Sequence, residues 1–150
     1  MIFRRWLVDP SGREAAPQEK IRVKLLVDTH AFLWALMHDH RLSARSKQIL
    51  TSEEHELYFS LVSLWEFSIK IKTGKLNALG SSVAYLRDEM ENYSMQLLPI
   101  RYQHILQLEI LPAHHGDPFD RLLIAQAITE SLPILTDDAK FRLYPVKSIW

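Results

Sequence analysis

Short apolar runs alternate with longer amphipathic segments along most of the chain. The first run, residues 23–27, consists mainly of valine and leucine and ends at Asp28, as in a strand buried within a parallel sheet. Further strands are predicted at residues 57–60, 95–100, 133–136 and 146–149. The same patterns predict helices at residues 29–37, 43–52, 63–73, 82–93 and 118–130, with another beginning at Tyr102. Because helices alternate with strands, we expect an α/β fold in which helices cover both faces of a parallel sheet.

Residues 1–22 do not follow this pattern. They contain several turn-forming residues, and their basic side chains outnumber their acidic ones. We interpret this segment as a flexible N-terminal extension, with a basic arm for RNA as the alternative. The folded domain is expected to span residues 23–150.

Composition narrows the class of protein. The 150 residues are 47% hydrophobic and 24% charged, as in one globular domain, and the absence of cysteine excludes thiolate metal sites. Lysine and arginine balance aspartate and glutamate at 18 each, so any contact with nucleic acid must be local. No apolar stretch approaches the roughly 20 residues that cross a bilayer, and we expect a cytoplasmic protein.

Acidic residues follow the predicted strands at points that a parallel sheet would bring together. Asp28 ends the first strand, Glu66 and Asp120 lie near the starts of predicted helices, and Asp138 follows the strand at 133–136. The carboxyl ends of parallel strands form one rim, which is where ligands bind in open α/β sheets. We therefore expect these four carboxylates to converge.

Each acid also has a purely structural interpretation. The sequence from Ser63 to Glu66 has the form of a capping box, and Asp117 with Pro118 and Asp120 has the form of a helix start. Asp28 is the exception, because a carboxylate that ends an apolar strand is costly when buried without a partner.

Carboxylates gathered in one pocket repel one another unless a cation lies among them. Ligation by oxygen alone favours Mg²⁺ or Mn²⁺ over zinc, and the spacing of His38, His40, His114 and His115 matches no zinc motif. A hard divalent ion held by carboxylates is typical of phosphodiester hydrolysis. The sequence has no phosphate-binding glycine loop and no serine-hydrolase elbow.

Four segments resemble successive motifs of the PIN-domain ribonucleases, specifically VapC-type toxins of toxin–antitoxin pairs. They are KLLVDTHAFLW (24–34), SLWE (63–66), HGDPFDRLLIAQA (115–127) and LTDD (135–138). The resemblance covers residues 23–150. It implies a three-layer α/β/α fold with about five parallel strands, a metal-dependent endoribonuclease, a VapB-like antitoxin and a homodimer.

The resemblance also implies roles for individual residues. Asp28, Glu66, Asp120 and Asp138 would form the catalytic and metal-binding quartet, with Mg²⁺ or Mn²⁺ as cofactor. Four further residues would support it: Asp117 as a helix cap or a metal ligand, Thr29 and Thr136 as hydrogen-bond partners of the carboxylates or of the scissile phosphate, and Arg121 as a phosphate contact or salt-bridge partner. The extension departs from the pattern, since such toxins usually begin just before the first strand.

Other interpretations stay open at this point. A catalytically silent PIN-like binding module would use the same acids only as caps, whereas a phosphatase is disfavoured because no second aspartate stands two positions after Asp28. We expect Lys70 to pair with Glu66 four residues earlier rather than to bind RNA. Trp34, Trp65 and Ile69 are expected in the core, with an antitoxin or dimer contact as the alternative for Trp65.

Overall fold

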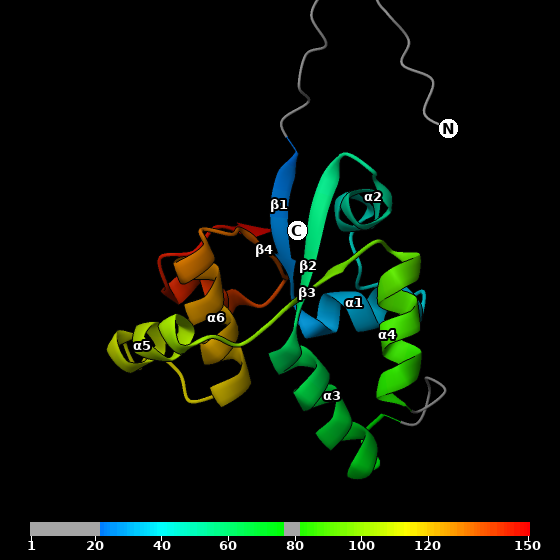
Figure 1. Ribbon diagram of the computed structural model, residues 1–150. Helices are drawn as coiled ribbons and strands as arrows, with labels where there is room; N and C mark the ends of the chain where they lie inside the picture. Colours follow the sequence, from blue (N-terminus) through cyan, green and yellow to red (C-terminus); the bar gives the residue numbers. More distant parts are fainter. Residues whose placement is uncertain (1–21, 77–81) are drawn as a thin grey trace, which may run out of the picture.

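The computed structural model describes residues 22–76 and 82–150, so the prediction for the N-terminal extension falls almost entirely outside the described residues. Five parallel strands form one sheet in the order β3-β2-β1-β4-β5 (Figure 1). They are β1 (Val23–Val27), β2 (His55–Ser60), β3 (Gln96–Leu98), β4 (Ile134–Leu135) and β5 (Ser148–Ile149). The predicted parallel sheet is confirmed.

Helices cover both faces of this sheet. They are α1 (Thr29–Leu36), α2 (Ala44–Thr51), α3 (Leu61–Lys72), α4 (Val83–Asn92), α5 (Tyr102–Ile110), α6 (Pro118–Glu130) and the short 3₁₀ helix η1 (Ala139–Leu143). In Figure 1, α1, α2 and α4 lie on one side of the strands, and α5 and α6 lie on the other. The three-layer α/β/α architecture is therefore confirmed. Within the described residues, no helix is long and apolar enough to span a membrane.

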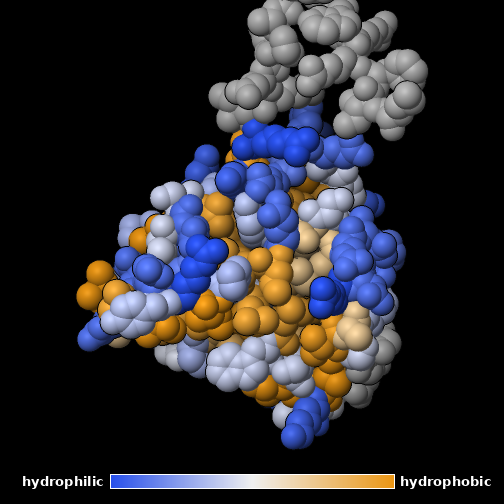
Figure 2. All heavy atoms as spheres, in the orientation of Figure 1, coloured by the Kyte–Doolittle hydropathy of each residue, from blue (hydrophilic) through white to orange (hydrophobic). Residues whose placement is uncertain are grey.

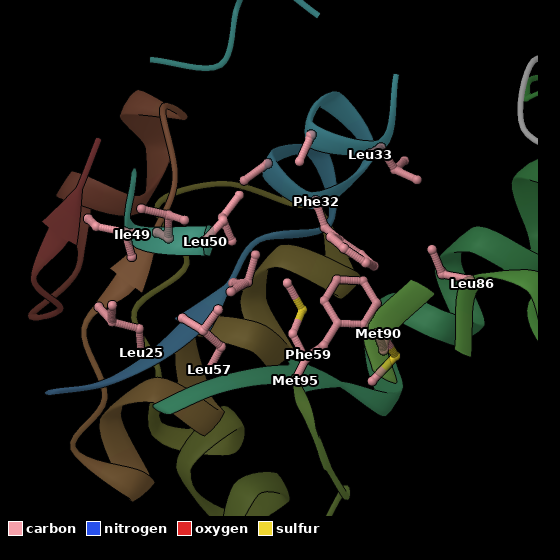
Figure 3. Packing of buried hydrophobic residues seen from close by; sticks show 14 of the residues in the cluster. Leu25, Phe32, Leu33, Ile49, Leu50, Leu57, Phe59, Leu86, Met90 and Met95 are labelled. Atoms are coloured by element: carbon pink, nitrogen blue, oxygen red, sulfur yellow. The ribbon is translucent and has the colours of Figure 1, made fainter. Parts of the chain in front are cut away.

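Alternation along the strands divides the core into two clusters. Leu25 and Val27 of β1 join Leu57 and Phe59 of β2 in the cluster beneath α1, α2 and α4 (Figure 3). Leu26, which lies between them in sequence, joins the cluster beneath α5 and α6. Successive side chains of a strand point to opposite faces, so a strand buried on both faces must be apolar throughout.

The strand register aligns the ends of the central strands. Val27 pairs with Phe59 of β2 and with Leu135 of β4. The residues that follow these three are polar and buried: Asp28, Ser60 and Thr136. The carboxyl ends of β1, β2 and β4 therefore present polar side chains at one rim, as the parallel arrangement predicted.

Helix α3 begins two residues earlier than predicted, and the expected capping box is wrong. Ser60 is the N-cap, and its Oγ accepts a hydrogen bond of 3.0 Å from the backbone N–H of Val62. Ser63 lies inside the helix, where its Oγ accepts a 2.7 Å hydrogen bond from Thr29. Glu66 is thus beyond the first turn and is free of a capping role. The local pattern contained two serines, and the first of them is the cap in the structure.

The ends of two helices match their sequence signals. Helix α6 spans the predicted residues, with Pro118 at its first position and Asp117 as N-cap. Oδ1 of Asp117 accepts hydrogen bonds from the backbone N–H groups of Phe119 (2.9 Å) and Asp120 (3.0 Å). Gly74 follows the end of α3 with a φ of +72°, a left-handed conformation in which glycine is favoured.

Candidate functional site

Asp28 lies at the centre of the polar rim and is only 4% exposed. Its Oδ2 accepts a 3.0 Å hydrogen bond from Oγ1 of Thr136, whereas Oδ1 is buried and has no hydrogen-bond partner among the described residues. Burial, with the nearby charges of Glu66 and Asp138, raises the pKa of Asp28 to about 6, although His30 and Thr136 act in the opposite direction. The structure therefore leaves one oxygen of a buried carboxyl group unsatisfied.

Asp120 enters the same region from the first turn of α6 and is 8% exposed. Burial is the largest cause that raises the pKa of Asp120 to about 7. The charges of Asp117, Asp28, Glu66 and Asp138 raise it further, in that order. Since the other three predicted carboxylates all act on Asp120, the fold has brought the four acids into one electrostatic cluster.

Glu66 reaches the cluster from α3 and already has a cationic partner. Lys70 Nζ donates a 2.9 Å hydrogen bond to Glu66 Oε1, which confirms the expected pair four residues apart on the helix. Nζ also lies 3.4 Å from Nε2 of His30, in the first helix after Asp28. Lys70 therefore contacts both Glu66 of the acidic cluster and His30 of α1.

Asp138 and Asp117 each use one carboxylate oxygen to cap a helix. Asp138 Oδ1 accepts from the backbone N–H of Lys140 (2.9 Å) at the start of η1. The backbone N–H of Asp138 in turn donates to Oγ1 of Thr136 (3.1 Å). Asp138 acts electrostatically on both Asp28 and Asp120, whereas Asp117 acts on Asp120. Capping by Asp117 is thus confirmed, and a role of either residue in metal binding stays a prediction.

Two of the predicted supporting residues have contacts other than those expected. Thr29 donates to Ser63 rather than to a carboxylate, because α1 packs directly against α3. Arg121 donates to the carbonyls of Leu111 (3.2 Å) and Pro112 (2.8 Å) in the loop before α6. Within residues 22–76 and 82–150, no ion pair joins Arg121 to an acid, so the salt-bridge alternative is wrong. A contact between Arg121 and a phosphate group stays a prediction.

His115 is a neighbour of the cluster that sequence reasoning did not assign to it. Its Nε2 lies 3.8 Å from Oδ2 of Asp120, and its Nδ1 lies 2.6 Å from the hydroxyl of Tyr144. Burial, together with the charge of Lys140, lowers the pKa of His115 below its ordinary value, which favours the neutral ring. The sequence did contain a signal for this residue. His115 begins the segment that contains Asp117 and Asp120, and it lies three residues before the start of α6.

The donor set fits a hard divalent cation better than zinc. The clustered ligand groups are carboxylates, and burial together with the charges of the neighbouring acids raises the pKa values of Asp28 and Asp120. The buried Oδ1 of Asp28, at the same place, accepts no hydrogen bond from any residue that the structure describes. In the described part of the chain, however, no three acidic or imidazole side chains already form a complete metal-binding group. Loading would require the side chains to move closer together.

The outer surface beside the cluster carries exposed apolar side chains. Trp65 is 56% exposed and Ile69 is 39% exposed, so their predicted place in the core is wrong, whereas Trp34 is partly buried. The Trp65 ring packs edge-on against Phe119 at the start of α6, with 5.0 Å between ring centroids. Figure 2 shows apolar residues gathered over the lower part of the molecule, where Figure 1 places α3, α5 and α6.

Comparisons with known proteins identify the family. Residues 25–147 match the PIN domain. VapBC2 from Rickettsia felis, solved with a promoter DNA fragment, has a TM-score of 0.67 at 14% identity, covering 85% of this chain and 98% of the other. A toxin–antitoxin complex from Klebsiella pneumoniae has a TM-score of 0.58 at 17% identity, covering 84% and 96%. FitAcB from Neisseria gonorrhoeae has a TM-score of 0.60 at 18% identity, with the same coverage.

These structures share the fold at low sequence identity, and no curated protein matches the chain. The family match covers most of the sequence and includes each of the four clustered acids. The fold, the parallel strand order and the sequence match agree. The chain therefore belongs to the PIN domain family.

Proposed function

We propose that this protein is a VapC-type endoribonuclease toxin that hydrolyses RNA phosphodiester bonds with Mg²⁺ or Mn²⁺. The observation that carries the proposal is Asp28, whose buried Oδ1 has no hydrogen-bond partner in the described part of the chain and lies within a group of mutually repelling carboxylates. Such an arrangement is costly to the fold unless a cation completes it. The repulsion among these carboxylates destabilises the fold at this rim, and helix capping by Asp117 and Asp138 does not account for it.

The four acids divide between holding the metal and positioning the nucleophile. Asp28, Asp120 and Asp138 would hold the ion, and Glu66 would hold a second ion or position the attacking water. A bound hard cation supplies charge stabilisation for the phosphodiester and lowers the pKa of water. Thr136 would keep Asp28 in one orientation, because its hydroxyl occupies Oδ2 and leaves Oδ1 for the ligand. Lys70 would hold Glu66 at the edge of the cluster.

A pocket with cationic side chains supports RNA as the substrate despite the zero net charge, although Lys70 and Arg41 in its lining are also paired with Glu66 and Asp39. A pocket of about 230 Å³ adjoins the acidic cluster through the contact between Lys70 and Glu66. Its lining includes Arg41, Lys70, Lys75 and the rings of His30 and Trp34. Cationic and aromatic groups together are suited to phosphates and unpaired bases.

The exposed face of α3 supports a protein partner. Leu61, Trp65 and Ile69 recur every four residues, so they lie along one side of the helix, and all three are exposed. The structural neighbours include toxin–antitoxin complexes. We propose that an antitoxin covers this face and that the toxin itself forms a homodimer. Neighbouring exposed apolar side chains of this kind are typical of a surface that a partner protein covers.

The direct test is RNA cleavage by purified protein with Mg²⁺, with Mn²⁺ and with EDTA, followed by sequencing of the new RNA ends. The proposal predicts defined ends that appear only with metal and that are lost in Asp28→Asn. Cleavage that is unaffected by both EDTA and Asp28→Asn would identify a contaminating nuclease and would reject this site.

A catalytically silent binding module is the second candidate, because Asp117 and Asp138 cap helices and Glu66 is already paired with Lys70. Metal titration separates the two functions. The nuclease should unfold at a higher temperature as Mn²⁺ is added, since ligand binding to the folded state stabilises it. The binding module should show no such rise.

A further inference from the structure

Resting on the proposed function, we infer that His115 is a positioning residue for Asp120 and that Tyr144 holds its ring in the tautomer with the proton on Nε2. Neither residue belongs to the acidic cluster. His115 lies in the loop before α6, and Tyr144 follows η1. The two come together because Arg121 ties that loop to the body of the domain through several carbonyls and the Tyr144 hydroxyl.

The Tyr144 hydroxyl has one proton to donate, and its contacts determine where that proton goes. Its oxygen accepts hydrogen bonds from the backbone N–H of His115 (3.2 Å) and from Arg121 Nη1 (3.3 Å). A phenolic hydroxyl has a single proton to donate, and its oxygen already faces these two N–H donors. The remaining short contact, 2.6 Å to His115 Nδ1, must therefore be a donation from the tyrosine.

This donation determines the tautomer of the histidine. In a neutral imidazole one ring nitrogen accepts while the other carries the proton. Because Nδ1 accepts from Tyr144, the proton lies on Nε2. Nε2 is buried, has no hydrogen-bond partner among the described residues, and lies 3.8 Å from Oδ2 of Asp120.

The consequence is an N–H group 3.8 Å from an oxygen of Asp120, a carboxylate to which the proposed function assigns the metal ion. A small approach of the two side chains would convert the 3.8 Å separation into a hydrogen bond, which favours the carboxylate and fixes its orientation. Groups that orient metal ligands in this manner typically change metal affinity 10–100-fold when they are removed.

The tautomer is tested directly by long-range ¹H–¹⁵N NMR on protein labelled at histidine nitrogen, at about pH 8 and in EDTA. His115→Gln identifies the His115 signals. We expect the wild-type ring to carry its proton on Nε2 and Tyr144→Phe to lose this preference. A wild-type proton on Nδ1, or an unchanged tautomer in Tyr144→Phe, would overturn the inference whatever the protein does to RNA.

Mn²⁺ binding by calorimetry tests the link to Asp120. Tyr144→Phe keeps the ring that packs in the core, and we expect it to weaken Mn²⁺ binding about tenfold. His115→Gln keeps an N–H donor and should weaken binding less than His115→Leu. Tyr58→Phe is the matched control, because the Tyr58 hydroxyl donates to Glu56 on β2.

The outcomes distinguish the inference from the proposed function. Equal Mn²⁺ affinity in wild type, Tyr144→Phe and His115→Leu would overturn the inference while the nuclease proposal stands. A wild-type protein that binds no Mn²⁺ would overturn the nuclease proposal. It would also reject the inference that His115 positions Asp120 as a metal ligand.

Discussion

Thr136 and Asp28 are 108 positions apart in the sequence, and a 3.0 Å hydrogen bond joins them across the ends of β4 and β1. The bond satisfies one oxygen of a buried carboxyl group and leaves the other without a partner among the described residues. The same threonine oxygen accepts from the backbone of Asp138. One hydroxyl group therefore positions two of the four clustered acids.

Replacement of Asp28 by asparagine should abolish metal-stimulated RNA cleavage while the fold is retained. The substitution removes a negative charge from a repulsive group, so the metal-free variant should unfold at a higher temperature than wild type at about pH 8. We expect at least about a 100-fold loss of cleavage, since the loss of a direct ligand should exceed that of its supporting contacts. Cleavage assays and thermal unfolding check the two effects.

Asp137→Asn is the control for this experiment, because Asp137 is exposed and stands next to Asp138. It should leave both cleavage and unfolding close to wild type. If Asp137→Asn lost activity while Asp28→Asn kept it, the assignment of the acids would be wrong.

The stability that Asp28 and Asp120 contribute to the metal-free protein should fall as pH rises from about 5 to about 8. The folded pKa values of about 6 for Asp28 and about 7 for Asp120 exceed the ordinary value of 3.8. Between the ordinary pKa of 3.8 and the folded values of about 6 and about 7, the folded state binds more protons than the unfolded state. Raising the pH through this range therefore destabilises the folded state. Asp120→Asn should reduce this fall and raise the melting temperature near pH 8.

Thermal unfolding in EDTA over that pH range checks the prediction. Asp88→Asn serves as the control, because it makes the same chemical change at an exposed position on α4. An Asp120→Asn profile parallel to that of wild type would mean that Asp120 ionises in the folded protein much as in the unfolded chain.

Loss of the Thr136 hydroxyl should destabilise the protein. Thr136→Val retains the shape of the side chain, but it leaves Asp28 Oδ2 and the Asp138 backbone N–H without this partner. The expected cost is about 1–3 kcal/mol, the range for buried polar groups whose partner is removed. Urea unfolding measures it, with Thr136→Ser as the variant that keeps the hydroxyl; equal losses in both variants would contradict a role for the hydrogen bonds.

Substitutions of two aromatic residues two positions apart on α3 should destabilise the protein to very different extents. Trp65→Ser should cost about 1 kcal/mol or less, because the ring is mostly exposed, whereas Phe67→Ala should cost about 3–5 kcal/mol because Phe67 is fully buried. Urea unfolding of both variants compares the two costs. Comparable losses would place Trp65 in the core and would remove the support for a partner on that face.

Local signals in the sequence were sufficient for much of the fold. The apolar run that ends at Asp28 and the Asp117–Pro118 helix start both depend on neighbouring residues, and the structure matches both closely. The alternation of strands and helices then restricts the sheet to a parallel one, which places the acids at a common rim. The convergence of Asp28, Glu66, Asp120 and Asp138 followed from these local elements.

Other features were decided only by contacts between distant parts of the chain. Ser60, not Ser63, is the cap of α3, and Ser63 instead accepts a hydrogen bond from Thr29 of α1. Trp65, on the same helix, is exposed. The contact of His115 with Tyr144 joins a loop to a residue beyond η1. Hydrophobic periodicity shows which side of a helix is apolar, but what covers that side, and which polar groups meet across the fold, depends on how the layers pack.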